Sequence, residues 1–125
     1  MRMASMLGHR FSVVATAKHS LPAEEAQVRA LHRDGLLAAV IAPPEGLAGA
    51  SEEEKVLEAA RMALVEDMAD VMVLGCAGMS GLGRRISEAL GAPVLDGVVC
   101  ALIIVTGLVR YGVSTSKVRR YNLEY

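Results

Sequence analysis

The apolar residues of this chain fall into short continuous runs that alternate with stretches of helical spacing. Four runs, at residues 11–16, 36–41, 71–74 and 92–96, show no regular alternation with polar residues, which predicts strands buried on both faces. A segment with helix signals follows each run, and strands that each lead into a helix favour a parallel sheet with right-handed crossovers. We therefore expect an α/β fold: a three-layer flavodoxin-like lobe with a four-stranded parallel sheet.

The clearest helix start lies at Ser51, which forms a capping box with Glu54 three residues later. An apolar stripe follows at helical spacing, which predicts that one face of this helix packs on the sheet. The residues before Gly8 indicate the last turns of another helix. The remaining helices are expected over residues 20–35, 82–91 and 98–111.

The longest apolar stretch, residues 98–109, contains 12 residues, whereas a membrane-spanning helix needs roughly 20. We therefore expect a buried helix here and no membrane partner. The start of the chain lacks the long apolar segment and the cleavage site of a signal peptide, which favours a cytoplasmic protein. We divide the chain into an α/β lobe, residues 1–97, and a C-terminal helix and tail, residues 98–125.

Composition is consistent with one domain that has an aliphatic core. The 125 residues are 53% hydrophobic but include only three Tyr, one Phe and no Trp. Thirteen Lys and Arg against 14 Asp and Glu give a net charge of −1, which argues against a nucleic-acid partner. The two cysteines, Cys76 and Cys100, have no companion at disulfide or zinc spacing, which indicates free thiols in a reducing compartment and no metal site.

Cys76 is the strongest candidate for chemistry, because it follows the predicted strand 71–74 within a segment of glycine and small residues, 75–79. A helix that opens beside a thiol favours the thiolate, which can act as a base or a nucleophile. The N–H groups of Ala77, Gly78 and Met79 can bind a carboxylate, an imide oxygen or a developing enolate, and glycines such as Gly75 permit close approach of a ligand. The alternative is a small cysteine buried at the end of a strand.

The carboxyl ends of the other predicted strands define the rest of the candidate site. Ligands of parallel sheets bind at this edge, which here carries Thr16, Pro43, Cys76 and Asp96. Asp96 precedes a predicted helix, so that a helix N-cap and a role beside the substrate are equally good interpretations.

Four motifs follow one another along this chain: Phe11-Ser12-Val13-Val14-Ala15-Thr16, Gly75-Cys76-Ala77-Gly78-Met79, Pro93-Val94-Leu95-Asp96-Gly97-Val98-Val99 and Gly112-Val113-Ser114-Thr115-Ser116-Lys117. In these motifs and their order, the chain resembles the hydantoin racemases of the Asp/Glu racemase superfamily. The resemblance covers the part of the family that follows its first catalytic cysteine, and family members are longer and have two lobes.

The resemblance implies a racemase without cofactor or metal, in which two cysteines on opposite sides of a cleft exchange a proton at the carbon beside a carbonyl. The substrate would be a 5-substituted hydantoin or a related amino-acid derivative. Cys76 matches the second-lobe cysteine, Thr16 matches a threonine at the rim of the cleft, and Asp96 matches the acid that ends the last strand. The first-lobe cysteine has no counterpart, and residues 98–125 would pack on that first lobe.

The remaining candidates have simpler interpretations. We expect Cys100 to be a buried core thiol, because apolar residues surround it in the sequence. The three histidines lack ligand spacing to another His or Cys and are expected at the surface, with His19 the one near the predicted edge. The hydroxyl-rich segment 114–117 could bind an anion or form an ordinary turn.

Two other functions stay open. A relative with one cysteine could be a decarboxylase or a cis-trans isomerase, in which one thiol protonates an enediolate or adds to a double bond. A lobe without its partner could instead be non-catalytic and associate with itself as a homo-oligomer through the surface that the first lobe would cover.

Overall fold

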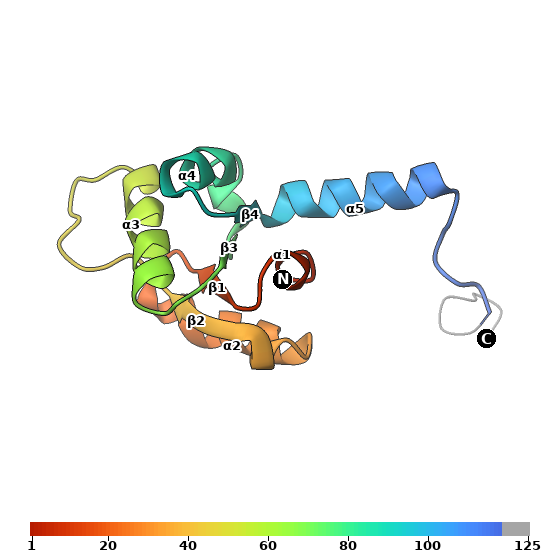
Figure 1. The fold of residues 1–125 in the computed structure, drawn as a ribbon, viewed down its shortest axis with the longest axis horizontal. Helices are drawn as coiled ribbons and strands as arrows, with labels where there is room; N and C mark the ends of the chain where they lie inside the picture. Colours follow the sequence, from red (N-terminus) through yellow and green to blue (C-terminus); the bar gives the residue numbers. More distant parts are fainter. Residues whose placement is uncertain (119–125) are drawn as a thin grey trace.

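The computed structural model describes residues 1–118, with four strands in one sheet and helices on both of its faces (Figure 1). Three short 3-10 turns, η1 (Lys18–Ser20), η2 (Asp34–Leu36) and η3 (Ala77–Met79), interrupt the loops. The main elements are α1 (Ala4–Leu7), β1 (Phe11–Val14), α2 (Leu21–Ala30), β2 (Leu37–Ile41), α3 (Glu52–Val65), β3 (Val71–Leu74), α4 (Gly83–Leu90), β4 (Val94–Asp96) and α5 (Gly97–Tyr111).

The sheet confirms the predicted parallel α/β architecture. The strands lie in the order β2-β1-β3-β4, and every neighbouring pair is parallel. A tight hairpin turn cannot join two parallel strands. The connections therefore cross over the faces of the sheet as helices, which gives a three-layer arrangement. The predicted strand 71–74 agrees residue for residue with β3.

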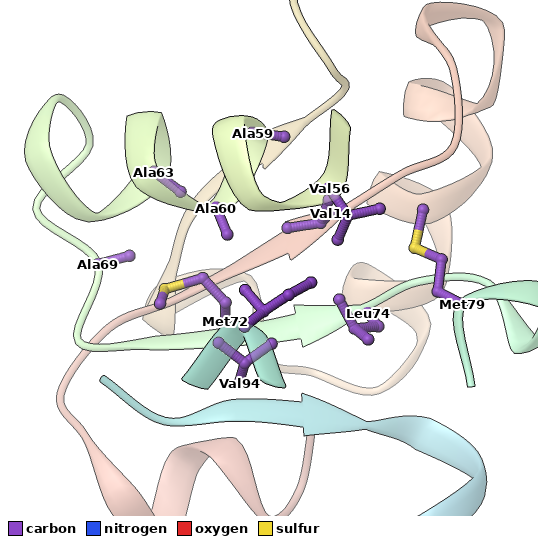
Figure 2. Packing of buried hydrophobic residues seen from close by; sticks show 11 residues of the cluster. Val14, Val56, Ala59, Ala60, Ala63, Ala69, Met72, Leu74, Met79 and Val94 are labelled. Carbon is purple, nitrogen blue, oxygen red and sulfur yellow. The ribbon is translucent and has the colours of Figure 1, made fainter. Parts of the chain in front are cut away.

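Two hydrophobic clusters hold the layers together, one on each face of the sheet. On one face, Val56, Ala60 and Ala63 of α3 point toward Val14 and Met72, as Figure 2 shows. Alanine at these buried positions lets the helix backbone approach the sheet closely. The other face packs against α1 and α2 through a cluster of Ala4, Phe11, Val13, Val28, Val71 and Val73.

The capping box at the start of α3 is confirmed. The Ser51 hydroxyl accepts a hydrogen bond from the Glu54 N–H at 3.2 Å, and the Ser51 N–H donates to the Glu54 carboxylate at 2.7 Å. The cap fixes the first turn of α3 and therefore the register in which its alanine stripe meets the sheet.

The strand over residues 37–41 differs from the prediction. Its five residues are half-buried rather than buried on both faces, because β2 lies at the edge of the sheet. Sequence periodicity does not distinguish an edge strand from a central one when both are apolar.

Helix α5 is the largest difference between prediction and structure. The expected buried helix instead extends away from the sheet (Figure 1), with Leu102 62% and Val109 70% exposed. Its side chains are apolar, but within residues 1–118 most of its length has no neighbour. None of the helices in this part of the chain is long and apolar enough to cross a membrane. The division at residue 97 stays a prediction, and the end of the expected tail, residues 119–125, lies outside the described residues.

Replacing Ser51 with alanine tests the cap of α3. Loss of the hydroxyl removes the acceptor for the Glu54 N–H, so we expect the free energy of unfolding to fall by about 1 kcal/mol. Urea unfolding followed by circular dichroism measures this change. Ser87→Ala, which removes a hydroxyl that donates to the Ala92 carbonyl within the same lobe, gives the comparison for an ordinary hydrogen bond. An unchanged urea midpoint for Ser51→Ala would show that the cap does not stabilise the lobe.

Candidate active site

The strand register brings the predicted edge positions to one side of the sheet. Val14 is paired with Ile41 on one side and with Leu74 on the other, and Leu74 is paired with Asp96. Thr16, Pro43 and Cys76 each lie two residues beyond these paired positions, so the three stand at the same carboxyl edge. Thr16 is exposed there, whereas Asp96 is at the level of Leu74, two residues before this edge, and is buried.

Cys76 leaves β3 in an extended conformation and caps the 3-10 turn η3. Its Sγ accepts a hydrogen bond from the Gly78 N–H at 3.4 Å, and its side chain is half-buried. A pocket of about 130 Å³ lies against it. The residues that line this pocket are Leu74, Gly75, Cys76, Ala77, Gly97 and Val98. The thiol therefore lies at the rim of the sheet beside an open space, not sealed in the core.

The backbone amides after Cys76 are used differently from the prediction. The Met79 N–H donates to the Cys76 carbonyl at 3.1 Å, and the Met79 side chain is fully buried in the core. Neither is available to a ligand, because the segment is a tight 3-10 turn and α4 begins only at Gly83. The Gly78 N–H points at the thiol sulfur, and the Ala77 N–H has no acceptor within residues 1–118. Of the three predicted amides, that of Ala77 is thus the one left to donate to a ligand oxygen.

The Asp96 carboxylate is the most highly coordinated side chain of the site. Its Oδ1 accepts from the N–H groups of Val98 at 2.8 Å and Val99 at 3.2 Å, which caps α5. Its Oδ2 accepts from the Ser80 hydroxyl at 2.9 Å and the Gly81 N–H at 2.7 Å. Of the two interpretations predicted for Asp96, a helix N-cap and a role beside the substrate, the structure shows the N-cap.

These hydrogen bonds also set the charge of Asp96. Burial of the carboxyl acts to raise its pKa, but the hydrogen bonds from Gly81, Ser80, Val99 and Val98 outweigh burial and lower the pKa below its ordinary value. Asp96 is therefore an anion that holds backbone in place, and a catalytic proton is not expected on it.

Gly75 and Glu24 are in close contact, which local sequence patterns do not reveal. A Cβ added at Gly75 would lie 2.9 Å from Glu24 Oε1 and 3.1 Å from Val13 Cγ1. A side chain at position 75 would force the Glu24 carboxylate and the buried Val13 side chain to shift, because they occupy the space of its Cβ. The packing against Glu24 explains the glycine without a ligand, so that its predicted role in ligand approach stays a prediction, and Glu24 is a residue that the sequence interpretation missed.

Cys100 and the histidines lie apart from the Cys76 thiol pocket. Cys100 is half-buried rather than part of the core and lines a second pocket of about 370 Å³. Burial raises the pKa of its thiol, with a smaller opposing effect from the chain's amino terminus. His9, His19 and His32 are exposed, and the described part of the chain contains no group of three or more His, Cys, Asp or Glu that could hold a metal ion.

Comparison with known proteins gives one consistent result. A family model described as Asp/Glu/hydantoin racemase matches residues 1–103. The hydantoin racemase of Paenarthrobacter aurescens is 35% identical over 124 residues, which are 95% of this chain and 52% of the relative. The hydantoin racemase of Rhizobium meliloti is 36% identical over 125 residues, 96% of this chain and 52% of the relative.

Solved structures agree with the sequence relatives. The allantoin racemase of Pseudomonas fluorescens superimposes with a TM-score of 0.81 at 38% identity, over 96% of this chain and 53% of that one. The allantoin racemase of Klebsiella pneumoniae gives 0.82 at 35% identity, over 94% of this chain and 50% of that one. The chain thus spans about half the length of the relatives it matches.

Asp96→Asn tests the carboxylate at the rim. Asparagine can still cap α5 through its side-chain oxygen, but the NH₂ group that replaces Oδ2 cannot accept from the Gly81 N–H, so we expect a loss of about 2 kcal/mol in the free energy of unfolding at pH 7. Because the folded pKa is lowered, the contribution of the charge is complete above the unfolded pKa near 3.8 and is lost as the pH falls through the folded value.

The measurement is urea unfolding of both proteins from pH 7 down to pH 2.5. The difference between them should shrink only below about pH 4. Asp34→Asn, at an exposed position, is the matched control. A gap between wild type and Asp96→Asn that does not depend on pH would contradict this account.

Proposed function

Because this chain belongs to the Asp/Glu/hydantoin racemase family, we propose that it carries one half of a racemase site for hydantoin-type amino-acid derivatives, with Cys76 as one acid/base. The single observation that carries the proposal is the position of the thiol: at the carboxyl edge of the sheet, beside a pocket and next to the Ala77 amide. The proposed substrate-binding residues are Thr16, Gly75, Ala77 and Gly78, while the other two predicted positions, Met79 and Asp96, hold the turn in place without touching the substrate.

The proposed chemistry needs no group beyond thiol and amide. The Cys76 thiolate takes the proton from C5 of the hydantoin, and the C–H electron pair moves into the adjacent carbonyl to form an enolate. The Ala77 N–H is placed to donate to the enolate oxygen. A proton delivered to C5 from the opposite face completes inversion, whereas return of a proton from Cys76 gives exchange without inversion. A well-placed general base contributes typically 10²- to 10⁴-fold.

The second acid/base must come from outside these residues. Cys100 does not replace it, because it lines a different pocket. The relatives are about twice as long as this chain, which supports a further lobe as the source. A cytoplasmic location is part of the proposal, and the two free thiols are compatible with a reducing compartment.

We propose that residues 98–125 pack on that further lobe. The support is α5, whose apolar side chains are exposed along most of its length and which carries a single charged residue, Arg110. Exposed apolar surface of this extent marks an interaction site. Without the further lobe, the same helix favours association of two copies, which is the second candidate function: a non-catalytic lobe that forms a homo-oligomer.

Hydrogen exchange tests the acid/base role of Cys76. The chain is incubated in D₂O with one enantiomer of a 5-substituted hydantoin, and NMR follows deuterium at C5 while polarimetry follows inversion. We expect exchange above the buffer rate with retained configuration, because only one face has a base. Cys76→Ser should lower the protein-dependent rate at least 100-fold.

Cys100→Ser is the matched control and should leave exchange unchanged. Equal exchange by wild type and Cys76→Ser would contradict the role of Cys76. Full inversion by the isolated chain would contradict the need for a further lobe.

Sedimentation tests the apolar surface of α5. We expect the 13.2 kDa chain to sediment as a dimer or larger species at micromolar concentration. Leu102→Glu with Val109→Glu should give a folded monomer, because both side chains lie on the exposed surface of α5 and not in the core of the lobe. Val65→Glu, at an exposed apolar position on α3, is the control. A monomeric wild-type chain would contradict an α5 interface between copies.

A further inference from the structure

Helix α5 is apolar and exposed on every side, not on one face only. Successive residues of an α-helix are turned by about 100°, so the four residues 102–105 point in four different directions. All four are aliphatic, and their exposed fractions are 62% for Leu102, 55% for Ile103, 44% for Ile104 and 57% for Val105. Within residues 1–118, this turn of the helix therefore has no buried side (Figure 1).

The polar part of α5 is a narrow strip formed by Thr106 and Arg110. These two residues are four apart, so they lie on the same side of the helix, between the directions of Leu102 and Ile103. The rest of the surface, from Ile103 round to Leu102, is apolar over roughly 260° when each residue turns the helix by about 100°. A helix that packs on one flat surface needs an apolar stripe of little more than about 100°. One flat surface therefore cannot cover α5.

The side of α5 that faces its own lobe is open as well. Cys100, Ala101 and Ile104 line the pocket of about 370 Å³, whose opposite wall comes from α2 and from the first residues of the chain. The polar residues of that wall are Arg2, Glu24 and Gln27. Because the pocket separates α5 from this wall, the helix does not pack against its own lobe here, and this side is also accessible to another lobe.

We propose that α5 is a core helix of the further lobe: it lies in an apolar groove that contacts three sides of the helix and leaves only the strip of Thr106 and Arg110 open. The inference rests on the proposed function and deepens it, because it names the partner surface as a groove and not a flat face. A helix that is apolar nearly all round belongs inside a protein core. The occupant is the further lobe, because the relatives are about twice as long as this chain. A second copy of the chain is the other occupant that the test decides on.

The groove also bears on the chemistry at Cys76. Gly97 and Val98, the first residues of α5, line the pocket beside the thiol, and Asp96 caps the helix. One continuous helix therefore leads from the thiol edge into the groove. The position of the groove sets where the further lobe, and the acid/base that it supplies, stand relative to Cys76.

The test is a binding measurement that needs no turnover. The probe is the part of the Pseudomonas fluorescens allantoin racemase that this chain does not match, produced as a separate polypeptide and immobilised for biolayer interferometry. Wild-type chain should bind it. Leu102→Glu, Ile103→Glu, Ile104→Glu and Val105→Glu, made one at a time, should each weaken binding at least about 100-fold, because each would bury a charge without a partner in the groove.

Thr106→Glu is the matched control on the same helix. Its carboxylate would lie on the open strip, four residues before Arg110, so binding should change less than about threefold. Val65→Glu, at an exposed apolar position on α3, controls for added charge elsewhere in the lobe. Circular dichroism should show the wild-type helix content in every variant, because all these side chains are exposed in the chain alone.

The outcomes separate the groove from the proposed function. Binding that is lost in Val105→Glu but kept in Ile103→Glu, on the opposite side of the helix, overturns the groove and leaves α5 packed by one face on the further lobe. An immobilised probe that binds the matched half of its own racemase but not this chain overturns both the groove and that packing, and a chain that then binds only its own copies assigns α5 to the second copy. The acid/base role of Cys76 is decided by the exchange experiment alone.

Discussion

The Asp96 carboxylate accepts four hydrogen bonds from two separate segments, and the geometry of the Cys76 edge depends on it. One oxygen holds the start of α5, and the other holds Ser80 and Gly81, just after the turn that Cys76 caps. The end of β4, the first turn of α5 and the exit of the turn are thereby fixed relative to one another. The small pocket beside the thiol lies between the turn and the start of α5, so its shape follows from this one anion.

Much of the fold could be predicted because its causes are local. The apolar run 71–74 and the capping box at Ser51 are encoded by adjacent residues, and both agree with the structure. The carboxyl edge could be predicted from topology, since parallel strands end on one side. The position of Cys76 followed from the strand 71–74 and from the shared carboxyl edge of parallel strands.

The rest depends on tertiary contacts that a single sequence does not display. Nothing near Met79 shows that its N–H closes a 3-10 turn instead of facing a ligand. The exposure of α5 could not be inferred from its composition, because an apolar helix looks the same whether its neighbour is present or not. The contact between Glu24 and Gly75 joins positions 51 residues apart in the chain, and no periodicity predicts it.

The proposed further lobe would account for both the half-length match to the relatives and the exposed α5. A lobe that normally faces another should carry an apolar element without a neighbour and a site with a base on one face only. The exposed α5 and the proposed site lie at the same end of the sheet, since α5 starts where β4 ends. Association of two copies through α5 would cover the same surface without supplying the same chemistry.

The most direct test of this account is a crystal structure of the chain with a bound 5-substituted hydantoin. The account predicts that C5 of the ligand lies within about 3.5 Å of Cys76 Sγ, with a ring oxygen at the Ala77 N–H and one face of the ring left without an acid/base. A ligand bound away from the carboxyl edge of the sheet, or one whose C5 faces away from the thiol, would contradict it.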